Sequence, residues 1–181
     1  MSTLAEYQRR LRDMIKGRSG PPPGDRHLAE VAQSPGLTLI REIAVWWRTL
    51  AVEGYCPWST RLLKRLGIFE QSVKQFYCEQ NVSPYVEKAG PQFLVELSGH
   101  AHPVVAALAR FELAILKVKQ GDPGEYTVDW DRNPDAVFAS FTTGHDVPAS
   151  EAHIYRTYIS RDIPGLVRCE QIPREDCSRN Q

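Results

Sequence analysis

Cys56 is the first residue in this chain whose side chain could do chemistry, and Pro57 and Trp58 follow it directly. A catalytic cysteine needs a base close by and an electropositive setting that stabilises its thiolate. No histidine lies near Cys56 in the sequence, although one could approach it in space. An enzyme with a cysteine nucleophile is therefore only the third hypothesis for this chain.

Two histidines, His100 and His102, form the second group, and Pro103 follows them. A zinc site needs a cluster of Cys and His ligands. Proline is tolerated in the first turn of a helix, so this segment marks a helix start more readily than a metal site. We therefore expect no metal ligands here, and we expect thiols at all four cysteines, which lack C-x-x-C spacing: Cys56, Cys78, Cys169 and Cys177.

Three carboxylates form the last group, since Glu125, Asp129 and Asp131 surround Trp130. Carboxylates on the outer face of an edge strand usually serve solvation and protection from aggregation. The chain contains no dinucleotide fingerprint, phosphate loop, nucleophile elbow or zinc-protease motif. The sequence therefore predicts no catalytic residue, and it favours a binding module over an enzyme.

Composition narrows the class of protein further. The 181 residues contain 42% hydrophobic and 24% charged residues, which suits one core or a helical unit with a small appendage. Lys plus Arg and Asp plus Glu number 22 each, so the chain has no general attraction to nucleic acid. The absence of an apolar run of about 20 residues, and of a secretory signal, predicts a cytoplasmic protein without a membrane span.

The elements that must position these residues begin with helices. Apolar periodicity, caps and breakers predict a buried helix over 37–52, with Ile40, Ile43, Trp47 and Leu50 as its main stripe. Trp46 and Trp47 are adjacent and cannot face the same way. We expect one in the core and the other toward another element or a partner. Further helices are expected over 3–16, 25–33, 59–66, 70–80, 84–97 and 103–119.

Two local signals refine these helices. Ser59 is expected to cap the helix over 59–66. Pro91 is expected to kink or break the helix over 84–97 near Gly90, because proline removes a backbone donor and clashes with the preceding turn.

The pattern changes after Lys119. Residues 125–130 alternate strictly between apolar and polar, which predicts a half-buried strand. A short helix over 134–141 and strands over 153–160 and 166–172 follow. The expected fold class is α+β: an N-terminal multi-helix unit over 1–120, then a small antiparallel sheet of about three strands with one short helix over 121–173. Residues 174–181 are expected to be a mobile tail.

Three pieces of sequence carry a resemblance to a known family. They are the helix from Leu4 to Leu11, the Tyr85-x-x-x-x-Gly90-x-x-Phe93-Leu94 segment, and the Pro103-headed helix with Leu-Ala-Arg-Phe-Glu-Leu-Ala at 108–114. In this order they resemble the HvfC-type partner proteins of multinuclear non-haem iron oxidative enzymes. The stretch Pro21-Pro22-Pro23-Gly24 replaces the family's early Arg, Asn and Tyr segment, which suggests a divergent branch.

The resemblance implies a non-catalytic subunit that forms a heterodimer with the iron enzyme and recruits the leader of a ribosomally made precursor peptide. A cysteine of that peptide would be modified, with the 3-thiaglutamate pathway as the first expectation and a methanobactin-like pathway as the second. Iron is expected in the partner enzyme, and no cofactor is expected in this chain. The alternative is a helical DNA-binding or regulatory protein, which should show a concentrated basic face.

The sheet is the expected place for the peptide, because an extended peptide can add to an open strand edge. The alternative that the sheet only covers the helices, with its edges closed, stays open. Candidate peptide-binding residues are Tyr126, Val128, Trp130, Tyr155, Arg156, Thr157 and Tyr158. Candidate residues of the partner interface are Trp46, Tyr85 and Phe93.

Overall fold

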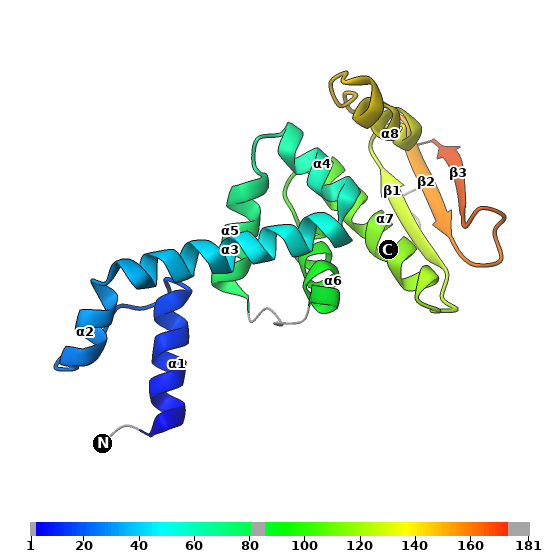
Figure 1. The fold of residues 1–181 in the computed structure, drawn as a ribbon. Coiled ribbons are helices and arrows are strands. Elements are labelled where there is room, and N and C mark those ends of the chain that lie inside the picture. Colours follow the sequence, from blue (N-terminus) through cyan, green and yellow to red (C-terminus); the bar gives the residue numbers. More distant parts are fainter. Residues whose placement is uncertain (1–2, 81–85, 174–181) are drawn as a thin grey trace.

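The computed structural model describes residues 3–80 and 86–173, which form eight helices and a three-stranded antiparallel sheet (Figure 1). Seven helices precede the sheet, and the eighth lies between its first and second strands. This confirms the α+β class with a helical N-terminal part. The expected tail over 174–181 lies outside the described residues. The elements are α1 Leu4–Ile15, α2 Arg26–Ala32, α3 Pro35–Tyr55, α4 Pro57–Arg65, α5 Phe69–Glu79, α6 Val86–Leu97, α7 Pro103–Lys119, β1 Tyr126–Trp130, α8 Pro134–Thr143, β2 Ile154–Ile159 and β3 Val167–Ile172.

Local sequence explains most helix starts. Thr3 forms a capping box with Glu6 at α1, and Ser34 and Asn133 cap α3 and α8 with their side chains. The predicted cap at Ser59 is wrong. Helix α4 already begins at Pro57, so Ser59 lies inside it, and the residue at its N-cap position supplies no side-chain hydrogen bond.

Helix α6 runs through Pro91 without the break that the sequence predicts. Pro91 lies early in the helix, so the one backbone bond it removes is close to the helix start. The buried side chains of Phe93, Leu94 and Leu97 hold the rest of α6 in the core. Gly90 lies against α3, since a Cβ atom there would come within 2.4 Å of the Tyr55 Cβ.

One hydrophobic cluster contains residues of helices α3 through α7, of the sheet and of α8. Aromatic rings form the junction. Phe111 of α7 lies 5.7 Å from Trp130 of β1 and 5.3 Å from Phe138 of α8, measured between ring centroids. Helices α3 to α7 and the segment 121–173 therefore share this core.

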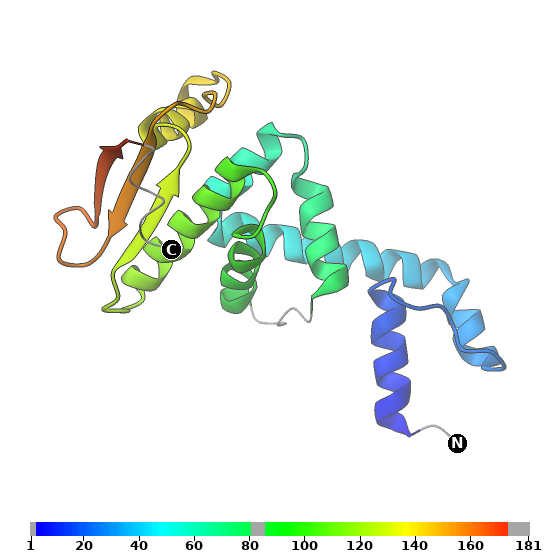
Figure 2. The same cartoon turned by 180° about the vertical axis from the view of Figure 1, so that it is seen from behind.

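Helices α1 and α2 form an arm at the N-terminal end of α3, on the side away from the sheet (Figure 1; Figure 2). The arm has a small core of its own, made by Met14 and Leu28 with Leu37 of α3. Lys16 and Arg18 both donate to the Gln80 carbonyl, at 3.1 and 2.9 Å. These cations lie at the C-terminal end of α5, where the helix dipole and the last carbonyls favour positive charge.

The face of α3 that contacts the protein is not its most apolar face. Leu37 and Val52 are buried, and Arg41, Ala44 and Arg48 between them are half-buried. The predicted burial of the Ile40, Ile43, Trp47 and Leu50 stripe is therefore wrong, and neither tryptophan lies in the core. Six large apolar side chains are 40% to 60% exposed: Leu39, Ile40, Ile43, Trp46, Trp47 and Leu50. We call these six residues the α3 apolar face.

Candidate binding surfaces

The sheet has strand order β1-β2-β3, and β2 pairs antiparallel with both neighbours. Val128 faces Thr157 across the first pair, and Thr157 faces Cys169 across the second. Because side chains alternate along a strand, these residues share one face with Trp130. Asp129 and Arg156 lie on the opposite, outer face.

Three of the predicted peptide-binding residues are buried on the inner face, against α7 and α8. Val128, Trp130 and Thr157 are at most 3% exposed. The Trp130 indole donates to the Thr157 hydroxyl at 3.1 Å, and that hydroxyl donates to the Val128 carbonyl at 3.2 Å. The prediction that these side chains contact a peptide is therefore wrong, because they complete the core and satisfy one another.

Two predicted residues, Tyr126 and Tyr155, are half-buried on the same inner face. The Tyr126 hydroxyl donates to Asp122 at 2.7 Å, and the Tyr155 hydroxyl donates to Glu151 at 2.8 Å. These hydrogen bonds to carboxylates raise the pKa of each tyrosine. Both hydroxyls hold connecting segments beside the sheet.

The last two predicted residues, Arg156 and Tyr158, lie on the outer face. Arg156 makes a two-pronged ion pair with Asp129, at 2.6 and 2.8 Å. The guanidinium of Arg168 lies 4.9 Å from the centroid of the Tyr158 ring. The seven predicted residues are thus divided between two faces, and the structure does not bring them together as one contact surface.

The backbone edges of the sheet remain available within the described residues. There β1 and β3 each pair with β2 alone, so each has one edge without a strand partner. Helix α7 runs beside β1, whereas β3 forms the outer margin of the sheet (Figure 1; Figure 2). Unpaired backbone groups at such edges are the structural requirement for adding a further strand.

A cavity of about 330 Å³ opens at the Trp130 end of β1. Pro103, Ala106 and Arg110 line it from one face of α7, and Trp130 lines it from the sheet. Arg110 is exposed and donates twice to the Ser98 carbonyl, at 3.2 and 2.9 Å. Sequence reasoning missed Arg110, because its place beside β1 depends on how α7 packs. The remaining lining residues are His100, Ala101, Asp129, Asp131 and Ile154.

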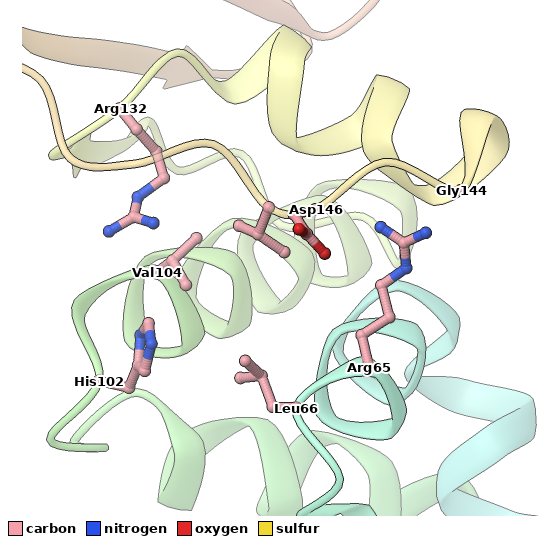
Figure 3. Close-up of a pocket in the computed structure, with 8 residues that line it drawn as sticks. Arg65, Leu66, His102, Val104, Arg132, Gly144 and Asp146 are labelled. Carbon is pink, nitrogen blue, oxygen red and sulfur yellow. The ribbon is translucent and has the colours of Figure 1, made fainter.

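A larger cavity of about 460 Å³ lies between α4, the start of α7 and the segment after α8 (Figure 3). Arg65 and Arg132 line it from opposite sides. Both arginines are engaged with the protein itself. Arg65 donates to the His145 carbonyl, and Arg132 donates to the Pro148 carbonyl at 2.6 Å.

Arg132 also forms a two-pronged ion pair with Asp131, at 2.7 Å for both bonds, which lowers the pKa of that carboxyl. These contacts fix the segment between α8 and β2 to the turn after β1. Arg65 and Arg132 therefore serve to anchor this segment.

The predicted partner residues have different outcomes. Trp46 is exposed on the α3 apolar face, and its ring lies edge-on to Trp47 at 5.0 Å. Phe93 is fully buried and packs edge-on against Phe76 at 5.2 Å. The prediction for Phe93 is therefore wrong, because its ring belongs to the core. Tyr85 lies outside the described residues.

The sequence did contain a signal for the rest of the α3 apolar face. Leu37, Ala44 and Val52 are apolar on one side of α3, and six large apolar residues between Leu39 and Leu50 share the other side, with two tryptophans in succession. A helix with apolar residues on two opposite sides needs cover on both sides. The presence of two apolar sides could have indicated that one of them is exposed.

Chemistry by Cys56 is disfavoured. Its side chain is fully buried, and burial raises the pKa of the thiol far above its ordinary value. The thiol lies 3.4 Å from the Gly90 carbonyl, to which it donates. Residues 3–80 and 86–173 contain no group of three or more His, Cys, Asp or Glu side chains placed to hold a metal. In the same residues, no helix has both the length and the apolar character to cross a bilayer.

Comparisons of the chain with family models, with curated proteins and with solved structures find no match. The likeness to HvfC-type partner proteins therefore depends on the three sequence segments described above.

Proposed function

We propose that this chain is a non-catalytic subunit that binds a larger enzyme through the α3 apolar face and presents a peptide to that enzyme from its sheet. The single observation that carries the proposal is the exposure of that face. Soluble proteins rarely expose a contiguous set of large apolar side chains, and such patches mark interaction sites.

The composition of the face suits a stable protein interface. Leu39 and Leu50 are eleven residues apart, so the face extends about 17 Å along the helix axis at about 1.5 Å per residue. Trp46 and Trp47 lie near its middle, and tryptophan is enriched among residues that dominate binding energy. The arm of α1 and α2 lies at one end of α3 (Figure 1).

Within residues 3–80 and 86–173, β1 and β3 each have one edge without a strand partner, which supports the second part of the proposal. Strand addition supplies affinity through backbone hydrogen bonds, and neighbouring pockets supply specificity. A subunit with one docking face and one such edge could hold two other chains at the same time.

The partner's identity comes from the resemblance. We propose a heterodimer with a multinuclear non-haem iron oxidative enzyme in the cytoplasm. The recruited peptide is the leader of a ribosomally made precursor whose cysteine the enzyme modifies, with 3-thiaglutamate formation preferred over a methanobactin-like pathway. All iron chemistry belongs to the partner, and this chain contributes binding and positioning.

The test is co-expression of the tagged chain with its genomic neighbours, followed by affinity purification and metal analysis. The wild-type chain should retain an iron-containing enzyme and a short cysteine-bearing peptide. A double variant, Ile43→Glu with Trp47→Glu, should lose the enzyme while keeping its helical circular dichroism. The matched control is Val95→Glu, which changes an apolar residue of α6 that is 59% exposed and should keep the enzyme.

Retention of the enzyme by the double variant would overturn the docking face. A stable homodimer that binds neither neighbour would overturn the whole proposal. Salt-sensitive binding of duplex DNA by the chain would favour the alternative of a helical DNA-binding or regulatory protein.

A further inference from the structure

We infer that the peptide adds to the edge of β1 that has no strand partner in the described residues, with side chains at the cavity beside the Trp130 end of β1, and that the bound segment carries an apolar residue next to an acidic one. This inference rests on the proposed peptide capture. It assigns one edge of the sheet and the side-chain chemistry that the edge selects.

The first step is the choice of edge. Strand addition needs backbone groups for affinity and pockets for specificity. The β1 edge has both, since its Trp130 end borders the cavity of about 330 Å³. On β3 the four middle residues are exposed, including Cys169 and Gln171 on the face that β1 and β2 bury. A strand added to β3 would extend beyond the helices, whereas one added to β1 would lie beside α7 (Figure 2).

The second step is the apolar residue. Ala101, Pro103 and Ile154 give the cavity an apolar wall, and these side chains are exposed or half-buried. A volume of about 330 Å³ is at the lower end of the roughly 300–1,000 Å³ typical of ligand pockets, so it suits one or two side chains.

The third step is charge. Both carboxylates at the cavity are already paired, Asp129 with Arg156 and Asp131 with Arg132. Arg110 instead donates to a neutral carbonyl, that of Ser98. The positive charge of Arg110 therefore favours an acidic side chain on the added strand, and a guanidinium can hold a carboxylate in a two-pronged pair.

The probe is a set of random 12-residue peptides selected by display on the full chain. Peptides are kept when the Ile43→Glu and Trp47→Glu double variant binds them as the wild type does. Those peptides should contain an apolar residue near an acidic one. Replacing that apolar residue with alanine should weaken binding roughly tenfold.

Backbone methylation tests the mode of binding. Two versions of a selected peptide are made, one N-methylated at the odd-numbered residues and the other at the even-numbered residues. One version should lose binding and the other should keep it, because an added strand pairs along only one of its edges. Equal effects in both versions would overturn strand addition.

Charge exchange tests the place. Arg110→Glu should weaken binding roughly tenfold, and changing the acidic residue of the peptide to arginine should restore it. Restored binding also shows that the variant is folded. The control is Arg168→Glu on β3, which should leave binding unchanged.

Loss of binding with Arg168→Glu but not with Arg110→Glu would place the peptide on β3. That result would overturn this inference and leave the proposed function standing. If every selected peptide binds only the α3 apolar face, peptide capture by the sheet is overturned as well.

Discussion

Glu112 illustrates how a single residue connects distant parts of the chain. It lies on α7, is only 2% exposed, and accepts backbone hydrogen bonds from Trp58 and Ser59, both at 2.9 Å. These two N–H groups belong to the first turn of α4, where a helix leaves its donors without internal partners. Glu112 thus supplies the cap that no side chain within α4 provides.

Burial raises the pKa of Glu112, and the hydrogen bonds at α4 only partly oppose this. A raised pKa in the folded state means that the folded chain holds this proton more tightly than the unfolded chain does. The stability contributed by the protonated carboxyl is complete below the ordinary value of 4.5 and is lost as pH rises through the raised value.

We expect Glu112→Ala to lower the free energy of unfolding by about 2 kcal/mol at acidic pH, because two buried donors lose their acceptor. The difference between wild type and variant should shrink as pH rises above 4.5. Urea unfolding at several pH values measures both quantities. Glu79→Ala, at an exposed glutamate near the end of α5, is the control and should have little effect. A wild-type and Glu112→Ala difference that does not change with pH would contradict the linkage.

At the scale of elements, the contact between α3 and α6 depends on the absence of a side chain. Gly90 of α6 leaves space for Tyr55 at the end of α3, and its carbonyl accepts from the Cys56 thiol. This close approach lets α6 pack tightly against α3 at Gly90, next to Pro91.

Gly90→Ala should therefore destabilise the protein by about 1–3 kcal/mol, because the new methyl group overlaps Tyr55 and forces the helices apart. The matched control is Gly54→Ala on α3, where a Cβ atom would meet nothing within 4 Å. That change should stabilise the helix by about 0.5–1 kcal/mol. Thermal and urea unfolding give both values, and equal effects of the two substitutions would refute the close contact.

The whole molecule has a large core and a small one. The large core contains residues of α3 through α7 and of the sheet. The arm of α1 and α2 has the small core of Met14, Leu28 and Leu37. Hydrogen bonds from Lys16 and Arg18 to the C-terminal end of α5 hold it as well. Regions with few buried apolar contacts open more readily than the core does.

Backbone amides of α1 and α2 should exchange with solvent deuterium at least about tenfold faster than those of α7 in the isolated chain. Addition of the partner enzyme should slow exchange in α3, whose apolar face becomes covered, more than in β3. Hydrogen exchange followed by mass spectrometry measures each segment. Equal exchange in α1 and α7 would show that the arm is as stable as the core.

Local sequence was enough to determine the type and order of the elements, although not the start of α4 or the continuity of α6. Apolar spacing at helical or alternating period, the caps at Thr3, Ser34 and Asn133, and the turn residues after Lys119 all act within a few neighbours along the chain. The order of elements, and with it the α+β class, follows from such short-range signals.

The tertiary structure alone decided which surfaces remain free. Periodicity shows that α3 has an apolar stripe, but only the positions of its neighbours determine that this stripe faces outward. Three further features likewise depend on residues far apart in sequence. They are the cap from Glu112, the burial of Phe93 and Trp130, and the cavity beside Arg110. Burial and exposure are properties of packed pairs of elements, so no single segment of the chain encodes them.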